Sequence, residues 1–124
     1  MAATMEDRIR YIEHAGKQIL LVDVSHCTAA EVAKISTLVP SYVVSEPPGS
    51  VLLLADFTDA EFDRAAVDSL KKSTVFDRPH LKKSAWVGTE NLPHIFFEHI
   101  KNFSRRELPT FPTRAEAMEW LVKD

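Results

Sequence analysis

The sequence is poor in cysteine and glycine and contains no long apolar run. Only Cys27 among the 124 residues is a cysteine, which excludes an intrachain disulfide, and three glycines are too few for a Gly-rich phosphate loop. No stretch approaches the roughly 18 to 20 apolar residues of a membrane-spanning helix. The first residues also lack the apolar segment of a signal peptide. We therefore expect a cytoplasmic protein without a membrane span.

Positive charge is also in short supply. Lys and Arg total 15 against 18 Asp and Glu, which gives a formal net charge of −3. Proteins that bind nucleic acid gain affinity by neutralising phosphates, so we expect no nucleic-acid partner. The chain does have an ordinary globular composition, with 45% apolar and 27% charged residues. Its length predicts a single domain over residues 1–124, large enough to bury roughly two thirds of its unfolded surface.

Short apolar runs alternate with amphipathic segments along the chain. Residues 8–24 read as two β-type runs joined by "HAGK", in which Gly16 suits a tight hairpin turn. The second of these runs is apolar at consecutive positions, which is typical of a strand covered on both faces. Further strands are expected at residues 51–57, at residues 84–88 and within "LPTFPT". After the segment around Pro40, residues 42–44 either continue a helix or form an extended piece.

Three T-x-A-E boxes predict helix starts, because the Thr side chain can cap a helix while the Glu reaches back to the cap. They begin at Thr28, Thr58 and Thr113. A fourth helix is expected at residues 91–103. The predicted order is ββαβαβαβα, an α/β single-domain sandwich of repeated β-α units with a mixed, mostly parallel sheet and an N-terminal hairpin.

If the later strands are parallel, their carboxyl ends meet at one edge of the sheet, where ligands of open α/β sheets usually bind. The polar residues expected there form the candidate interaction edge, and Thr58 is also a candidate phospho-acceptor. These residues are Asp23, Ser25, His26, Asp56, Thr58 and Thr89.

The sequence contains no recognisable catalytic or metal-binding set. His94 and His99 are five residues apart, which does not match the i, i+4 spacing of a helical metal site. Cys27 follows His26, but adjacent side chains usually point apart and no third member is nearby. Asp23 and Asp56 lack a third ligand for a cation. We expect no enzymatic activity, no cofactor and no metal.

Phe96 and Phe97 lie on adjacent faces of the expected helix at residues 91–103, so they are candidate contacts of a homodimer. The same helix and Trp86 offer an alternative function, because their aromatic side chains could line a site for a lipid-like or apolar ligand.

Four stretches carry a family resemblance: "GKQILLVDVS", "PPGSVLLLADFT", "LKKSAWVG" and "FPTRAEAMEWL". Together they resemble the SpoIIAA-like family of small bacterial proteins, which is related in fold to the STAS domain of anti-sigma-factor antagonists and distantly to Sec14-type lipid-binding domains. The resemblance implies a mixed sheet of β-α units and a regulatory module that binds a protein partner. In the antagonists a phosphorylated serine lies in an Asp-Ser-Ser-Gly motif; the similar place here is "ADFTD", where Asp56 is kept, Thr58 replaces serine and the glycine is missing.

Overall fold

The computed structural model describes residues 8–91 and 109–123, which form a mixed sheet with helices on both faces. The five strands lie in chain order, β1-β2-β3-β4-β5. β1 is antiparallel to β2, and each later neighbour is parallel to the strand before it. This arrangement confirms the predicted fold class. The strands are β1 (Ile9–His14), β2 (Lys17–Asp23), β3 (Val51–Asp56), β4 (Leu81–Val87) and β5 (Thr110–Phe111).

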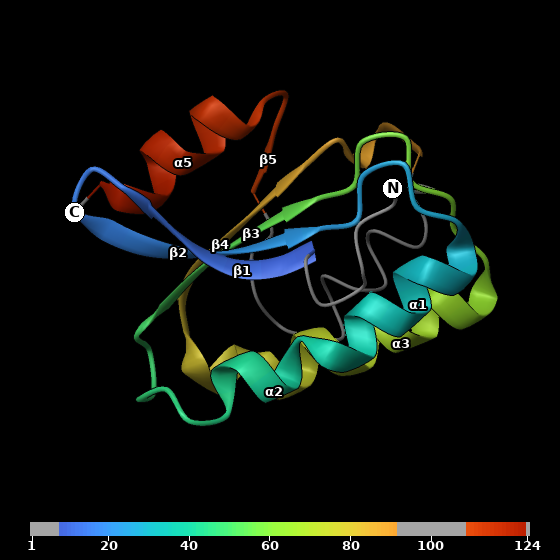
Figure 1. Ribbon diagram of the computed structural model, residues 1–124, viewed down its shortest axis with the longest axis horizontal. Helices are drawn as coiled ribbons and strands as arrows, with labels where there is room; N and C mark the ends of the chain where they lie inside the picture. The colour runs from blue at the N-terminus through green and yellow to red at the C-terminus, as the bar shows by residue number, and fades with distance from the viewer. Residues whose placement is uncertain (1–7, 92–108, 124) are drawn as a thin grey trace.

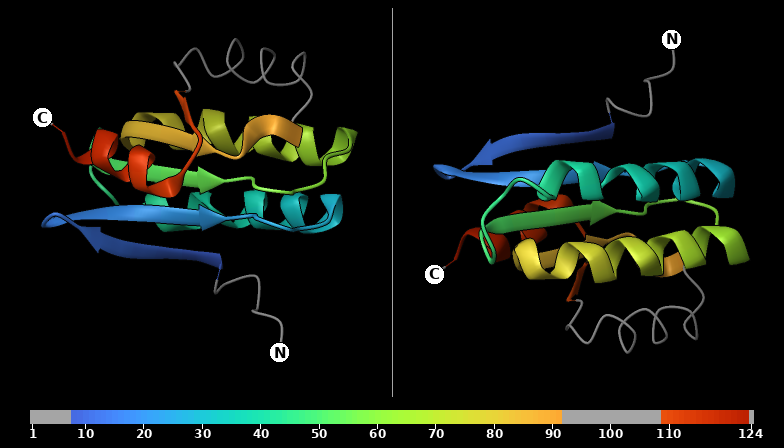
Figure 2. Two further views of the ribbon diagram at one scale, coloured as in Figure 1. Left: turned by 90° about the horizontal axis from the view of Figure 1, so that it is seen from above. Right: turned by 90° about the horizontal axis from the view of Figure 1, so that it is seen from below.

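The described helices divide between the two faces of the sheet (Figures 1 and 2). α1, α2 and α3 cover one face, with α1 and α3 side by side, and α5 covers the other. Two short 3-10 helices, η2 (Arg78–His80) and η3 (Thr89–Asn91), flank β4. The α-helices are α1 (Ala29–Leu38), α2 (Pro40–Val43), α3 (Arg64–Asp77) and α5 (Arg114–Val122).

The N-terminal hairpin and the strand beside it follow the sequence prediction. Ala15 and Gly16, with φ of 51° and 79°, form the two-residue turn between β1 and β2. Along β2, Leu20 and Val22 join the core under α1 and α3, whereas Ile19 and Leu21 join the core under α5. Both faces of β2 are therefore covered, which explains its uninterrupted apolar run.

Two of the three T-x-A-E boxes cap helices, and the middle one does not. Thr28 forms the full capping box with Glu31 at the start of α1, and Thr113 accepts a hydrogen bond from the Glu116 N–H at the start of α5. α3 instead begins at Arg64, where the Asp63 carboxylate accepts from the Ala66 N–H at 2.8 Å. The prediction of a helix start at Thr58 is therefore wrong.

The physical reason lies in the residues around Thr58. Its hydroxyl donates to Asp56 Oδ1 at 2.6 Å, and the next residue, Asp59, has a left-handed φ of 55°, which turns the chain out of a helical path. The N–H of Glu61, which a capped helix would direct to Thr58, donates to the carbonyl of Cys27 at 2.9 Å.

Two other segments complete the comparison with the predicted elements. After Pro40 the chain stays helical as α2, so the first of the two alternatives for residues 42–44 is correct. In α5, Ala117 and Leu121 are buried and Trp120 packs half-buried against the same core. Most of the helix predicted at residues 91–103, with the candidate dimer contacts Phe96 and Phe97, lies outside the described residues.

Candidate functional site

The carboxyl ends of β2, β3 and β4 lie side by side at one end of the sheet (Figure 1). Asp23 is in register with Asp56, and Asp56 with Val87. All six residues of the candidate interaction edge lie at these strand ends or in the segments that follow them, and we call them the strand-end rim: Asp23, Ser25, His26, Asp56, Thr58 and Thr89.

The loops after β2 and β3 have the same local structure. Asp23 Oδ1 accepts hydrogen bonds from the N–H and the hydroxyl of Ser25, at 3.0 and 2.5 Å. Asp56 Oδ1 accepts the same pair from Thr58, at 2.9 and 2.6 Å. Aspartate readily bonds the backbone two residues ahead in this way, so each Asp-x-Ser/Thr sequence forms its own turn.

Backbone hydrogen bonds hold the two loops together beyond the ends of the strands. Val24 N–H donates to the Asp56 carbonyl at 2.9 Å, and His26 N–H donates to the Thr58 carbonyl at 2.8 Å. On the other side, Phe57 N–H donates to the Val87 carbonyl at 2.8 Å. The strand ladder thus continues into the rim, which fixes the positions of its side chains.

Arg114, the first residue of α5, links the two aspartates. Its Nε lies 2.5 Å from Asp56 Oδ2, and its Nη2 lies 3.2 Å from Asp23 Oδ1. The Asp56 side chain is only 7% exposed, so this ion pair is largely shielded from water. Arg8 adds a second cation, whose Nη1 donates to the Ser25 carbonyl at 2.8 Å and lies 3.8 Å from Asp23 Oδ1.

Sequence reasoning missed both arginines. For Arg114 one signal was available, because a cation in the first turn of a helix opposes the helix dipole. An arginine in that place therefore indicates a specific acidic partner nearby. For Arg8 the sequence offered only an edge strand with mixed charges.

The surroundings at the rim favour the charged forms of Asp23 and Arg114. Burial on its own would raise the pKa of Asp23, but the hydrogen bonds from Ser25 and the positive charge of Arg114 outweigh it and lower that pKa. Burial on its own would lower the pKa of Arg114, and Asp56 and Asp23 together raise it. The pairing of Arg114 with Asp23 therefore favours the charged form of each group.

The loop after β3 is also enclosed by the end of β4. Gly88 has φ of 69°, and a Cβ at that position would come within 2.6 Å of the Cα of Thr58. Only glycine satisfies both the backbone angle and this close approach. Thr58 is consequently half-buried.

Two side chains of these loops project into solvent. His26 and Asp59 follow the two hydroxyl residues, both have left-handed φ, and their side chains are 68% and 67% exposed. His26 Nδ1 lies 3.5 Å from Asp59 Oδ2. Asp59 was not among the predicted rim residues, although its place after Thr58 matches that of His26 after Ser25.

The chemistry open to these groups is limited. The hydroxyls of Ser25 and Thr58 already donate to carboxylates that Arg114 engages. Cys27 is 1% exposed, and burial raises the pKa of its thiol, which disfavours the reactive thiolate. Within residues 8–91 and 109–123, no three His, Cys, Asp or Glu side chains are grouped so that they could hold a metal ion.

None of the helices in the described part of the chain is long and apolar enough to cross a membrane.

Comparison with known proteins relates the chain to one solved fold. The chain is similar to the crystal structure of an uncharacterised protein of the DUF3478 family with a SpoIIAA-like fold from Shewanella loihica PV-4. The TM-score is 0.65 at 18% sequence identity, and the match covers 91% of each chain. No family model matches the chain, and no curated protein matches it. The chain therefore has a SpoIIAA-like fold, as the sequence resemblance implied.

Proposed function

We propose that the chain is a cytoplasmic, non-enzymatic regulatory module that binds a protein partner through the strand-end rim. The observation that carries this proposal is the exposure of His26 and Asp59 on two matching loops whose backbones are held together by hydrogen bonds. A surface whose groups are already fixed loses little conformational entropy on binding, so it can hold a partner with few contacts.

The hydrogen bonds of the rim favour binding over catalysis. A serine or threonine nucleophile needs a base that is free to take its proton. Here the carboxylates beside Ser25 and Thr58 are occupied by backbone N–H groups and by Arg114. Transfer of the hydroxyl proton to either carboxylate would break these bonds, which makes both aspartates poor bases.

The regulation that we propose acts on Thr58. A phosphate there would replace the hydroxyl hydrogen that Asp56 Oδ1 accepts and would add close to two negative charges beside a buried carboxylate. The phosphate would attract Arg114, which is bonded to Asp56, so the bond from Arg114 to Asp56 would weaken. Phosphorylation would thereby reshape the surface that carries Asp59 and release the partner.

The alternative of a lipid-like ligand receives less support. The cavity between α3 and the sheet measures about 40 Å³, whereas sites for drug-sized ligands usually enclose roughly 300 to 1,000 Å³. A larger hollow of about 410 Å³ lies at α5, but charged side chains line it beside Phe111 and Trp120: Glu116, Glu119 and Lys123. The possible homodimer stays a prediction, since its candidate contacts lie outside the described residues.

The chain offers a matched pair of variants for testing the partner surface. The test variant is His26→Asn with Asp59→Asn, because asparagine tolerates left-handed φ. The control is His14→Asn with Glu119→Gln, a second exposed His–carboxylate pair, with 3.0 Å between Nε2 and Oε1. His14 is the last residue of β1, next to the hairpin turn and at the opposite end of the β1–β2 pair from Asp23, and Glu119 of α5 contacts it there.

Affinity capture from bacterial lysate, read by quantitative mass spectrometry, should identify a protein retained by the wild type and by the control variant. We expect the rim variant to retain at least about ten-fold less of it, as loss of roughly 1.4 kcal/mol implies. The purified partner then gives the Kd directly. Equal Kd values for the rim variant and the control would refute the proposed surface.

A further inference from the structure

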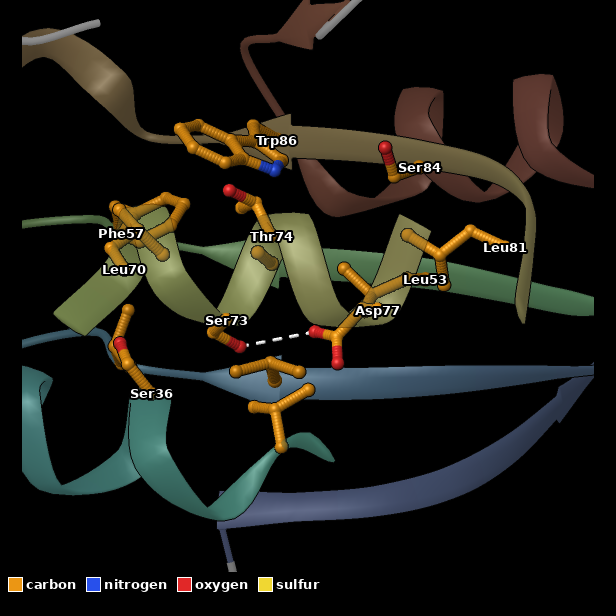
Figure 3. Close-up of a pocket in the computed structure, with 14 residues that line it drawn as sticks. Ser36, Leu53, Phe57, Leu70, Ser73, Thr74, Asp77, Leu81, Ser84 and Trp86 are labelled. Atoms are coloured by element: carbon orange, nitrogen blue, oxygen red, sulfur yellow. Dashed lines mark hydrogen bonds between the residues drawn. The ribbon is translucent and has the colours of Figure 1, made fainter. Parts of the chain in front are cut away.

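A small cavity lies inside the protein, between the sheet and the helices α1 and α3 (Figure 3). Most of its wall is apolar, and Phe57 and Trp86 form part of that wall. Polar side chains nevertheless line it from three elements: Ser36 from α1, Ser73, Thr74 and Asp77 from α3, and Ser84 from β4. Polar groups inside an apolar core need hydrogen-bond partners, so this cavity differs from a simple gap in the packing.

Two of these side chains have an atom that is buried without a hydrogen-bond partner among the described residues. Asp77 is 3% exposed; its Oδ2 accepts a hydrogen bond from Ser73 Oγ at 3.0 Å, but its Oδ1 has no partner there. The Oγ of Ser84, which is 4% exposed, also has none. Native proteins leave few buried polar atoms unsatisfied, because each one costs stability. The two atoms therefore point to an occupant of the cavity.

The other three hydroxyl groups of the cavity wall require an occupant that donates hydrogen bonds. Each of them already donates its own hydrogen within the protein: Ser36 Oγ to the Val32 carbonyl at 2.8 Å, Ser73 Oγ to Asp77, and Thr74 Oγ1 to the Lys71 carbonyl at 2.8 Å. A hydroxyl oxygen that donates still has two lone pairs, so these groups are left only as acceptors. A molecule without a hydrogen-bond donor would not complement them.

The carboxyl group of Asp77 requires an occupant that also accepts. Burial raises the pKa of Asp77 to about 7, against the lowering effects of the Ser73 hydrogen bond and the His80 charge. Below that pH the carboxyl is neutral, and because Oδ2 accepts from Ser73, the acidic hydrogen belongs on Oδ1, which then donates. Above that pH Oδ1 is an acceptor. Only a molecule that both donates and accepts is matched to both forms.

We propose that this cavity is an internal hydration site, in which about two ordered water molecules bond Asp77 Oδ1 and Ser84 Oγ and connect the last turn of α3 to β4. A buried water needs at least roughly 10–15 Å³ of cavity volume and two to four polar partners. The volume here is about 40 Å³, and five polar side chains line it. A dry cavity would leave both buried atoms unsatisfied. This inference does not depend on the function proposed for the rim.

The test counts long-lived waters on the full chain by oxygen-17 relaxation dispersion of the solvent at about pH 6, where Asp77 is neutral. Ser84→Val removes one unpartnered atom and adds a methyl group to the cavity, so it should lower the count by about one or two waters. Ser41→Ala is the control, because it removes an exposed hydroxyl that donates to the Leu38 carbonyl at 2.7 Å. We expect the control to keep the wild-type count. Equal counts in the wild type and Ser84→Val would overturn the proposal.

Two substitutions of Asp77 keep the test decisive even if Ser84→Val does not fold. Asp77→Leu removes the carboxyl group and leaves water without its main partner, so the count should fall by about two. Asp77→Asn has a similar shape and keeps one donor and one acceptor, so it should retain the wild-type count. An unchanged count in Asp77→Leu, or an equal loss in the two variants, would overturn the proposal.

Discussion

The strand-end rim and the interior cavity treat buried aspartates in opposite ways. At the rim, Asp56 accepts two hydrogen bonds from Thr58 and one from Arg114. At the cavity, Asp77 accepts one hydrogen bond, from Ser73. Asp23, also at the rim, has a lowered pKa, whereas the pKa of Asp77 is raised to about 7. At Asp77 burial has the largest effect, whereas at the less buried Asp23 the hydrogen bonds from Ser25 and the charge of Arg114 outweigh it.

This difference separates two kinds of buried polar group. A carboxylate with several donors fixes the surrounding chain, as Asp56 fixes the loop that carries Thr58. A carboxyl group that accepts only one hydrogen bond keeps an oxygen that a ligand can bind, and a change of pH can alter its charge. Substitutions at the rim and at the cavity can test that division.

Removal of Asp56 should be the most damaging change at the rim. Asp56→Ala leaves Arg114 and the Thr58 loop without their common partner, and we expect a loss of about 3–5 kcal/mol in the free energy of unfolding. Asp23→Ala should cost only about 1–2 kcal/mol, because Asp23 is 23% exposed and water can replace its contacts. Urea unfolding measures both variants, and equal losses would contradict the central position given to Asp56.

Substitution of Asp77 at the cavity should raise the free energy of unfolding at neutral pH, whereas substitution of Asp56 lowers it. The pKa of Asp77 rises from 3.8 to about 7 on folding, so between these values the unfolded chain releases its proton first and the folded state loses stability as pH rises. Asp77→Asn removes this loss. The variant should match the wild type near pH 4 and exceed it by about 2–4 kcal/mol at pH 8.

The control for this pH effect is Asp23, whose lowered pKa stabilises the folded state above pH 3.8 and ceases to do so as pH falls through the folded value. Thermal unfolding from pH 3 to pH 8 would show the two slopes. A variant Asp77→Asn that keeps the wild-type pH dependence would exclude Asp77 as its source.

A side chain at Gly88 should disturb the rim through sterics alone. Gly88→Ala combines a left-handed φ with a close contact to Thr58, and we expect a cost of about 2–4 kcal/mol. Gly49→Ala is the matched control, because its φ is 65° but no atom lies within 4 Å of the added Cβ. That substitution should cost about 1–2 kcal/mol. Similar losses in the two variants would mean that Thr58 moves aside at no cost.

Removal of a single threonine hydroxyl should cost the least stability. Thr28→Ala and Thr58→Ala should each cost about 1 kcal/mol, the first by loss of a helix cap and the second by loss of one hydrogen bond. A double-mutant cycle with Asp56→Ala distinguishes them. Thr58 should couple to Asp56 by about 0.5–1 kcal/mol, and Thr28 should show no coupling beyond error.

Local sequence signals predicted most of the fold. The hairpin at Gly16, the apolar strands and the caps at Thr28 and Thr113 depend on residues close together in the chain. The wrong prediction of a helix start at Thr58 also came from a local sequence signal. Its T-x-A-E pattern is indistinguishable from the other two boxes, and only the aspartate two residues before it redirects the hydroxyl. A preceding Asp-x-Thr competes with a capping box, and that competition is visible in the sequence.

The candidate site was predictable only in part. Strand direction alone predicts the position of the six rim residues at the carboxyl ends of β2, β3 and β4, while their role in binding stays a prediction. Arg114 comes from a different face of the sheet, and its bond to Asp56 spans 58 positions of sequence. The cavity depends on packing between α3 and the sheet, which no local pattern encodes.

The link from Arg114 to Asp56 also has a consequence for synthesis on the ribosome. β3 leaves the exit tunnel many residues before α5, so during that interval the Asp56 carboxylate has no arginine from α5 to pair with. A nascent chain can form the β2–β3 pairing early, but it cannot bury Asp56 at low cost. We therefore expect the centre of the sheet to reach its final stability only when α5 has emerged from the tunnel.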